Sequence, residues 1–324
     1  MLHLPTTAST YALNFALNYV QDRYATQSEE DYAEIVALCC IVKPLVTWHA
    51  ERTATICRER CGGQGFLACN RFGEAIVGAH AGITAEGDNR VIQQKVSKEL
   101  LDGMRSAKSA VAAHLAFRKL PGAMQRLLRR GQRLATSSSN PHAKTLELLA
   151  AREQWLKCEL AGRLYESKKA GTPLFDAWML QESDNVQALA TAYGQRIVVE
   201  QFDLAIETAA KAPGALAWTN VALLRDMRQL YALNVVLEDA AFFLAHGFMS
   251  PGDVEGAQRH VRELCASLGA EALTLTAGFG IDDAAHHAPI AHDFVKYFDE
   301  FNFGETDNQA YREANVASAR KGAK

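Results

Sequence analysis

The passage CGGQGFLACNRFGEAIVGAHAGITAEGDNRV fills residues 61–91 and interrupts a chain whose other patterns are nearly all helical. It opens with three closely spaced glycines: Gly62, Gly63 and Gly65. Glycines between helices form turns and helix C-caps, and they also let backbone N–H groups approach a phosphate or a ring that side chains would obstruct. On the residues alone, both uses remain open for this passage.

Glu86 stands near the end of the passage, just before a helix that is expected to begin at Asp88 or Asn89. Backbone N–H groups are unpaired at such a helix start, and small neighbours such as Gly87 leave room for a ligand to reach the carboxylate. A carboxylate placed there is a candidate general base. The alternative is an exposed loop glutamate without a catalytic role.

The segments on both sides of the passage have helical periodicity. A first helix is expected to run to about Tyr24, and a second, capped by Ser28, to about Arg60. Pro44 lies inside the second helix and predicts a kink or a break there. After the passage, helix resumes with apolar residues spaced four apart: Ile92, Val96 and Leu100.

The remainder of the chain is also expected to be helical. Two short helices separated by Pro121 precede the polar stretch 136–141, which predicts a linker. A long apolar stripe follows at helical spacing: Leu223, Met227, Leu230, Leu233, Leu237, Ala241 and Leu244. Gly247 predicts the end of that helix, and Ser250 caps another that is expected to continue to Gly278.

Composition bounds the class of protein. Hydrophobic residues make up 48% and charged residues 22% of the 324 positions, a profile typical of soluble globular proteins. The net charge of −3 argues against binding to nucleic acid, which requires a basic surface. The longest unbroken apolar run, residues 35–42, is too short to span a bilayer, and the amino terminus has no export signal. Cys39 and Cys40 are adjacent, which favours a reduced, intracellular compartment over a disulfide framework.

No alternating strand pattern is present, so we expect an all-α protein of two helical bundles. The first bundle is assigned to residues 1–135 and the second to residues 142–312, with the linker 136–141 between them and a charged tail over 313–324. Cysteines four apart, such as Cys57 and Cys61, have no companion pair at ligand spacing. No metal site is predicted.

Five segments together resemble one family. Residues 57–73 and 84–101 are similar to the carboxy-terminal helical domain of the acyl-CoA oxidases, which are relatives of the acyl-CoA dehydrogenases. Three later segments resemble the additional carboxy-terminal bundle that separates the oxidases from the dehydrogenases: LYALNVVLEDAAFFLAHGFMSP (230–251), FGIDDAAHHAPI (279–290) and YFDEFNFGE (297–305). The resemblance covers nearly the whole chain in the family's order.

The resemblance implies a catalytic role for Glu86, which matches the glutamate of the family's motif. In the family this carboxylate removes the α-proton of a fatty acyl-CoA while the β-hydrogen leaves as hydride to FAD. The products are a trans-2-enoyl-CoA and, after transfer of electrons to O2, hydrogen peroxide. The backbone N–H of Glu86 would bind the thioester oxygen, with Gly87 leaving space for it. The same resemblance implies that Gly62, Gly63 and Gly65 line the FAD dinucleotide of a partner subunit and that Asp88 lies near the flavin.

The family's amino-terminal helical domain and middle β-domain have no counterpart in these residues. The resemblance therefore implies a homodimer or completion by those domains, and weak FAD binding without turnover for the chain alone. It also implies a peroxisomal location in a eukaryotic cell, although the chain lacks the terminal Ser-Lys-Leu address; otherwise the location would be cytoplasmic. Two alternatives remain: a dehydrogenase-type flavoprotein fragment, and a non-catalytic dimerisation or interaction module.

Overall fold

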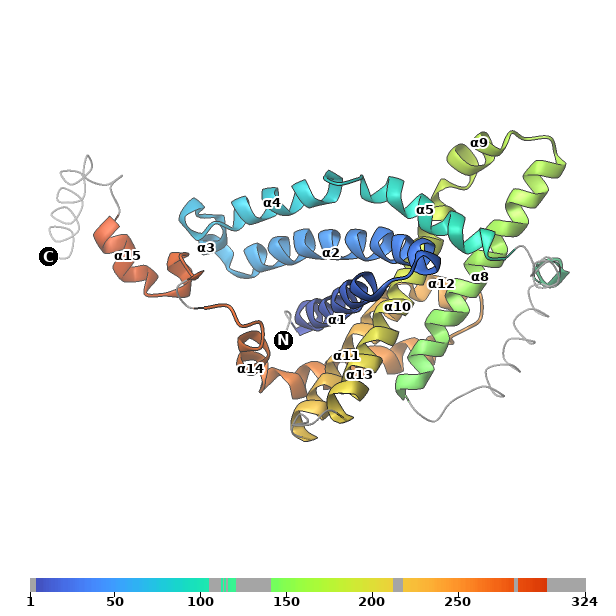
Figure 1. Cartoon of the computed structure of the whole chain (residues 1–324). Coiled ribbons are helices and arrows are strands. Elements are labelled where there is room, and N and C mark those ends of the chain that lie inside the picture. Colours follow the sequence, from blue (N-terminus) through green and yellow to red (C-terminus); the bar gives the residue numbers. More distant parts are fainter. Residues whose placement is uncertain are drawn as a thin grey trace, which may run out of the picture. The chain divides into compact units, whose positions relative to one another are not determined.

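A computed structural model describes residues 4–104, 112, 114, 116–120, 141–211, 218–282 and 285–301 of the chain (Figure 1). Within these ranges every regular element is helical, which confirms the all-α class. The first part comprises α1 (Leu4–Thr26), η1 (Glu29–Asp31), α2 (Tyr32–Arg60), α3 (Gly62–Phe66), η2 (Ala68–Asn70), α4 (Phe72–Thr84) and α5 (Asn89–Asp102). The second comprises α8 (Pro141–Lys169), α9 (Leu174–Asp176), η3 (Ala177–Gln181), α10 (Ser183–Lys211), α11 (Trp218–Glu238), α12 (Ala240–Ala245), α13 (Pro251–Gly269), α14 (Ala272–Ala277), η5 (Pro289–Ala291) and α15 (Phe294–Phe301).

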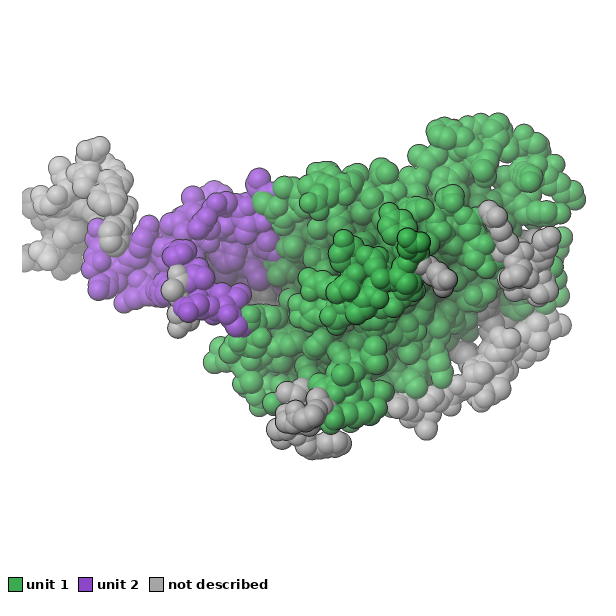
Figure 2. Space-filling view, in the orientation of Figure 1, with its two compact units in different colours: residues 1–53, 78–279 green, residues 54–77, 280–324 purple. Residues whose placement is uncertain are grey.

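The chain forms two compact units (Figure 2). Unit 1 contains residues 1–53 and 78–279, and unit 2 contains residues 54–77 and 280–324. The division into bundles at residues 136–141 stays a prediction; residues 121–140, which hold most of the predicted linker, lie outside the described residues, as does the tail 313–324. Pro141 is the first residue of α8 and not part of a linker.

Helix α10 is the centre of unit 1, where it contacts α1, α5, α8 and α11. Its Phe202 is fully buried, and burial of such a side chain contributes about 1.5–3 kcal/mol. Gly194 in the same helix allows α2 to approach closely, because a Cβ there would lie 2.3 Å from Ile41 Cγ1 and 2.9 Å from Leu45 Cδ1. This packing explains a glycine in the middle of a long helix.

Helix α2 continues through Pro44 without the break that the sequence allowed. A proline inside a helix removes one hydrogen bond and costs about 3 kcal/mol. Leu38, Ile41 and Val42 are each at most 2% exposed, and their burial next to the proline offsets that cost. The cap before α2 is also present, since the Asp31 carboxylate accepts hydrogen bonds from the backbone N–H (3.0 Å) and hydroxyl (2.9 Å) of Ser28.

The expectation that helix pauses throughout residues 61–88 is wrong for most of that stretch. Residues 62–66 form α3, and residues 72–84 form the thirteen-residue helix α4. Glycines weaken a helix by roughly 0.5–1 kcal/mol each and conceal its periodicity, which is why the sequence pattern did not predict α4. At Gly82 an added Cβ would lie 3.2 Å from Thr47 Cγ2, so this position is small because α4 lies against α2 there.

The apolar stripe of the second half is interrupted at Asp239, between α11 and α12. Met227 and Leu230 are fully buried as predicted, but Ala241 and Leu244 are exposed and Phe243 is buried in their place. At the interruption, Arg152 on α8 donates to the Asp239 carboxylate at 3.2 Å.

Two predicted helix boundaries after the stripe are confirmed, and one is wrong. Gly247 has φ +70° after α12, and Ser250 caps α13 by accepting from the Asp253 backbone N–H at 3.2 Å. Helix α13 ends at Gly269 and not at Gly278, and the separate helix α14 follows.

Helix α2 is also long and apolar enough to span a membrane by length and composition alone. A third of its most apolar window (33%) is buried inside the structure. Core helices of globular domains pass the same test, so one such helix is weak support for a span.

Candidate active site

The Glu86 segment connects α4 to α5 and has an unusual backbone. Glu86 has φ +54° and Gly87 has φ +102°, both in the left-handed region that residues other than glycine disfavour. A Cβ on Gly87 would also lie 2.9 Å from Ile92 Cγ2, so glycine is required there on two grounds. Glu86 itself is exposed. The carboxylate is therefore presented to solvent from a sharply bent connection.

Asp88 is the N-cap of α5, which selects one of the two helix starts, Asp88 or Asn89, that the sequence allowed. Its Oδ1 accepts hydrogen bonds from the backbone N–H groups of Arg90 (2.9 Å) and Val91 (3.3 Å). A carboxylate at a helix start also interacts favourably with the helix dipole. Asp88 therefore has a structural role, and its proximity to a flavin stays a prediction.

Asn89, the first residue of α5, is fully buried and joins the Glu86 segment to α2. Its Nδ2 donates to Thr47 Oγ1 at 2.9 Å, and its Oδ1 accepts from Lys43 Nζ at 2.8 Å. Lys43 Nζ also donates to the backbone carbonyls of Ile83 (3.1 Å) and Gly87 (2.7 Å). Sequence reasoning missed Lys43, although a single lysine directly after the apolar run 35–42 was a usable signal.

The structure gives different reasons for glycine at the three predicted cofactor positions. Gly62 has φ +57° just after α2 ends, so it turns the chain there. Gly65 is buried, and a Cβ on it would lie 2.1 Å from the backbone oxygen of Arg58. Gly63 has neither property: it is exposed, and nothing lies within 4 Å of its built Cβ. Gly63 is therefore the one position of the three whose missing side chain the local packing leaves unexplained.

Asn70 stabilises the glycine turn within unit 2. It is 3% exposed, and its Nδ2 donates to the backbone oxygen (2.9 Å) and side-chain oxygen (3.1 Å) of Gln64. Its Oδ1 accepts from the backbone N–H of Ile290 at 2.9 Å, which joins the turn to the carboxy-terminal segment. These contacts fix the glycine turn on both sides, while Gly62 and Gly63 stay exposed.

The predicted site residues fall into two groups. Glu86, Gly87 and Asp88 belong to unit 1, and the glycines of the turn belong to unit 2. Within each group the structure brings the predicted residues together. The binding of FAD and acyl-CoA by these residues stays a prediction.

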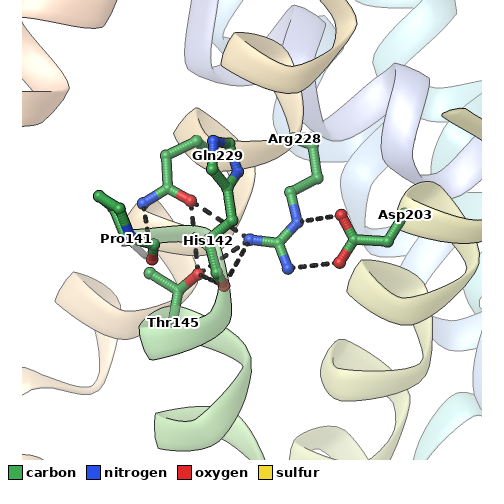
Figure 3. Close-up of polar contacts among 6 residues, drawn as sticks. All are labelled: Pro141, His142, Thr145, Asp203, Arg228 and Gln229. Atoms are coloured by element: carbon green, nitrogen blue, oxygen red, sulfur yellow. Dashed lines mark hydrogen bonds and ion pairs between the residues drawn. The ribbon is translucent and has the colours of Figure 1, made fainter. Parts of the chain in front are cut away.

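A second polar cluster, which the sequence did not reveal, lies where α8, α10 and α11 meet (Figure 3). Arg228 is 1% exposed and makes a bidentate ion pair with Asp203, with Nε–Oδ1 at 2.8 Å and NH2–Oδ2 at 2.5 Å. Its third nitrogen donates to the backbone oxygen of His142 (3.1 Å), to Thr145 Oγ1 (2.9 Å) and to Gln229 Oε1 (3.2 Å). The guanidinium thus joins three helices at the start of α8.

An open groove runs beside this cluster and is lined by His142, Ala143, Leu146, Glu200, Asp203, Leu204, Glu207 and Arg228. Burial, followed by the charge of Arg228, lowers the pKa of His142. All three guanidinium nitrogens of Arg228 donate within the chain, so the cluster joins α8, α10 and α11 and stabilises the fold.

The surroundings of two other titratable groups, Glu159 and His49, shift their pKa values. Glu159 is 8% exposed, and burial opposes its ionisation; hydrogen bonds from His114 (3.0 Å) and Arg163 (2.6 Å) nevertheless lower its pKa to about 2. Burial, followed by the charge of Arg52, lowers the pKa of His49 to about 4. Within the described residues no three His, Cys, Asp or Glu side chains are grouped as ligands for a metal ion.

Two family models match the chain. Residues 3–101 match the C-alpha1 domain of acyl-CoA oxidase, and residues 142–293 match the model described as acyl-CoA oxidase. Among curated proteins, the chain is 29% identical over 295 residues to putative acyl-coenzyme A oxidase 3.2, peroxisomal, of Arabidopsis thaliana, covering 90% of this chain and 42% of that protein. It is also 29% identical over 316 residues to human peroxisomal acyl-coenzyme A oxidase 3, covering 89% of this chain and 43% of that protein.

Solved structures share the fold. The crystal structure of acyl-CoA oxidase 3 from Yarrowia lipolytica superposes with a TM-score of 0.75 at 22% identity, over 97% of this chain and 47% of that one. Acyl-CoA oxidase-1 of Caenorhabditis elegans, crystallised with FAD and ATP, gives a TM-score of 0.75 at 18% identity, over 94% and 45%.

These matches define the class: the chain consists of all-helical domains of the kind found in acyl-CoA oxidases. The chain belongs to the acyl-CoA oxidase family, and it corresponds to the C-terminal portion of its members. It spans less than half the length of the curated relatives cited above, 42% and 43%.

Proposed function

We propose that this chain is the C-terminal part of an FAD-dependent acyl-CoA oxidase, which converts a fatty acyl-CoA to a trans-2-enoyl-CoA and reduces O2 to H2O2. In this reaction the acyl-CoA loses two hydrogens and O2 gains them, so the equation balances without another reactant. The observation that carries the proposal is the Glu86 segment: an exposed carboxylate on a bent connection, in a chain of this family.

Glu86 is the proposed general base. Within the described part of the chain, no hydrogen bond or ion pair engages its carboxylate, which is therefore open to a substrate. Its role is to take the α-proton of the thioester, while its backbone N–H polarises the thioester oxygen and Gly87 keeps the approach clear. FAD, when bound, supplies the acceptor for the β-hydrogen as hydride and the route of the electrons to O2.

The glycine turn, with Gly62, Gly63 and Gly65, is proposed to line the FAD dinucleotide of a partner subunit, and Asp88 is proposed to lie near the flavin. Bare backbone at Gly63, with nothing within 4 Å of a built Cβ, fits this use. Support at the family level comes from relatives crystallised with FAD, including acyl-CoA oxidase-1 of Caenorhabditis elegans. By the names of its relatives, the location we propose in a eukaryotic cell is the peroxisome.

The test joins the chain to the amino-terminal and middle domains of a relative and measures peroxide release from acyl-CoA. We expect Glu86→Gln to lower the rate by about 10²–10⁴-fold at unchanged flavin content. Glu255→Gln, at an exposed position of α13, is the matched control and should be neutral. Full activity of Glu86→Gln would refute the base assignment, and acyl-CoA oxidation without O2 consumption would indicate a dehydrogenase.

A second candidate function is a non-catalytic interaction module, and helix α4 favours it. None of its residues is buried although it is largely apolar, and Val77 is 72% exposed. Such a helix is expected to be covered by another surface, either the remaining domains or a second copy in a homodimer. A flavin absorbance scan and sedimentation of the purified chain discriminate these cases: a colourless, stable dimer supports the module, and a yellow protein supports the enzyme.

A further inference from the structure

One lysine of α2 contacts the Glu86 segment at three points. Lys43 Nζ donates to the carbonyl of Ile83 at 3.1 Å, to that of Gly87 at 2.7 Å, and to Asn89 Oδ1 at 2.8 Å. An ammonium group has three protons, so these three acceptors match its whole donor set. They come from the last turn of α4, from the connection itself and from the first residue of α5. Lys43 therefore holds both ends and the middle of the segment.

The acceptors have a physical need for this cation. Carbonyl groups in the last turn of a helix lack partners and carry the negative end of the helix dipole. The Ile83 carbonyl is such a group, since Ile83 lies in the last turn of α4. Asn89 is fully buried, so its amide oxygen requires a donor. Its amide nitrogen donates to Thr47 Oγ1 (2.9 Å), whose hydroxyl donates to the Lys43 carbonyl (3.0 Å). The network thus starts and ends on one turn of α2.

The backbone of the Glu86 segment has a conformation that needs support from its surroundings. Glu86 is one of two described residues other than glycine with positive φ, and Gly87 beside it is also left-handed. Such conformations are retained only where the surroundings impose them. We propose that Lys43 is a positioning residue, which holds residues 83–89 in the conformation that presents the Glu86 carboxylate. As a contribution to catalysis this rests on the proposed function.

The first experiment measures hydrogen–deuterium exchange of the amides of residues 84–92 in the full chain. Lys43→Met retains most of the stem and removes the three hydrogen bonds, so we expect exchange there to become at least about tenfold faster. Lys98→Met is the matched control: it removes an exposed lysine of α5 that pairs with Asp102 at 2.7 Å. Exchange of the segment should be unchanged in this control. Unchanged exchange in Lys43→Met would overturn the inference.

The second experiment uses the joined, flavin-loaded protein. A base displaced by about 1 Å loses rate at the chemical step, so Lys43→Met should lower kcat by roughly 10–100-fold while KM changes less than about twofold. Lys43→Arg keeps the charge and part of the donor set, and it should restore part of kcat. Unchanged kcat, or a loss confined to KM, would overturn the positioning role.

Failure of the two proposals can be told apart. If Lys43→Met accelerates exchange but Glu86→Gln retains full turnover, the proposed function fails, the catalytic role of Lys43 falls with it, and the contact to the segment stands. If Glu86→Gln is inactive while Lys43→Met changes neither exchange nor kcat, the base assignment stands and the Lys43 inference is wrong.

Discussion

The Arg228–Asp203 pair predicts an asymmetry between its two partners. The Arg228 side chain is 1% exposed and the Asp203 side chain 37% exposed. Breaking a buried ion pair by removing one partner costs about 3–5 kcal/mol, because the other charge remains uncompensated. Asp203→Asn leaves the buried guanidinium without its counter-ion, although it keeps its contacts to His142, Thr145 and Gln229. We therefore expect a loss near the lower end, about 3 kcal/mol.

Arg228→Met should cost less. It removes the buried charge itself, and water can solvate the carboxylate of Asp203 that remains. One former acceptor keeps a donor, since the single hydroxyl proton of Thr145 can be donated to the His142 carbonyl at 2.9 Å or to Gln229 Oε1 at 3.4 Å. The expected loss is about 1–2 kcal/mol, from hydrogen bonds alone.

The assay is urea unfolding followed by circular dichroism, with the midpoint and slope of each variant compared with the unmodified chain. The double variant should be about as stable as Arg228→Met alone, because no uncompensated charge is left in it. If Asp203→Asn were as mild as Arg228→Met, or milder, the reasoning from burial would be refuted.

Three further predictions concern packing and pH. Gly65→Ala should destabilise the chain by about 2 kcal/mol or more in urea unfolding, because its Cβ would lie 2.1 Å from the Arg58 carbonyl oxygen. Gly63→Ala should change stability by less than about 0.5 kcal/mol and should instead lower the flavin content of the joined protein. Equal stability of the two variants would contradict this prediction. The pKa of His49 is about 4 in the folded chain and 6.5 in the unfolded chain. His49 therefore contributes stability above pH 6.5, at most about 3 kcal/mol, which is lost as the pH falls to about 4. His49→Gln should remove this dependence of the unfolding free energy on pH between pH 6.5 and 4. The pKa of Glu159 is about 2 in the folded chain and 4.5 in the unfolded chain, so Glu159 contributes stability above pH 4.5 that is lost towards pH 2. Glu159→Gln should therefore destabilise the chain at pH 7, and it should weaken the pH dependence of the unfolding free energy only below pH 4.5. An unchanged acid limb in Glu159→Gln would show that its basic partners do not stabilise the fold.

The candidate site was partly readable from sequence. A helix start at Asp88 or Asn89, directly after Glu86 and Gly87, follows from local information, whereas the catalytic role of Glu86 was implied by the family resemblance and stays a prediction. The sequence marks Lys43 only as a lysine after an apolar run; its contact with the Gly87 carbonyl was not predictable, because the two residues lie 44 positions apart. Gly65 was predicted as a cofactor contact, but the structure gives a second reason for glycine there: a side chain would clash with the Arg58 backbone.

Local chemistry was sufficient for the helical class, for the caps at Ser28, Asp88 and Ser250, and for the helix stop at Gly247, because caps and stops depend on hydrogen bonds within a few residues. Packing between distant segments decided the rest. It kept α2 continuous through Pro44, because burial of Leu38, Ile41 and Val42 offsets a local cost of about 3 kcal/mol. It also pairs Asp239, where the apolar stripe is interrupted, with Arg152 of α8. Such contacts exist only once the chain has folded.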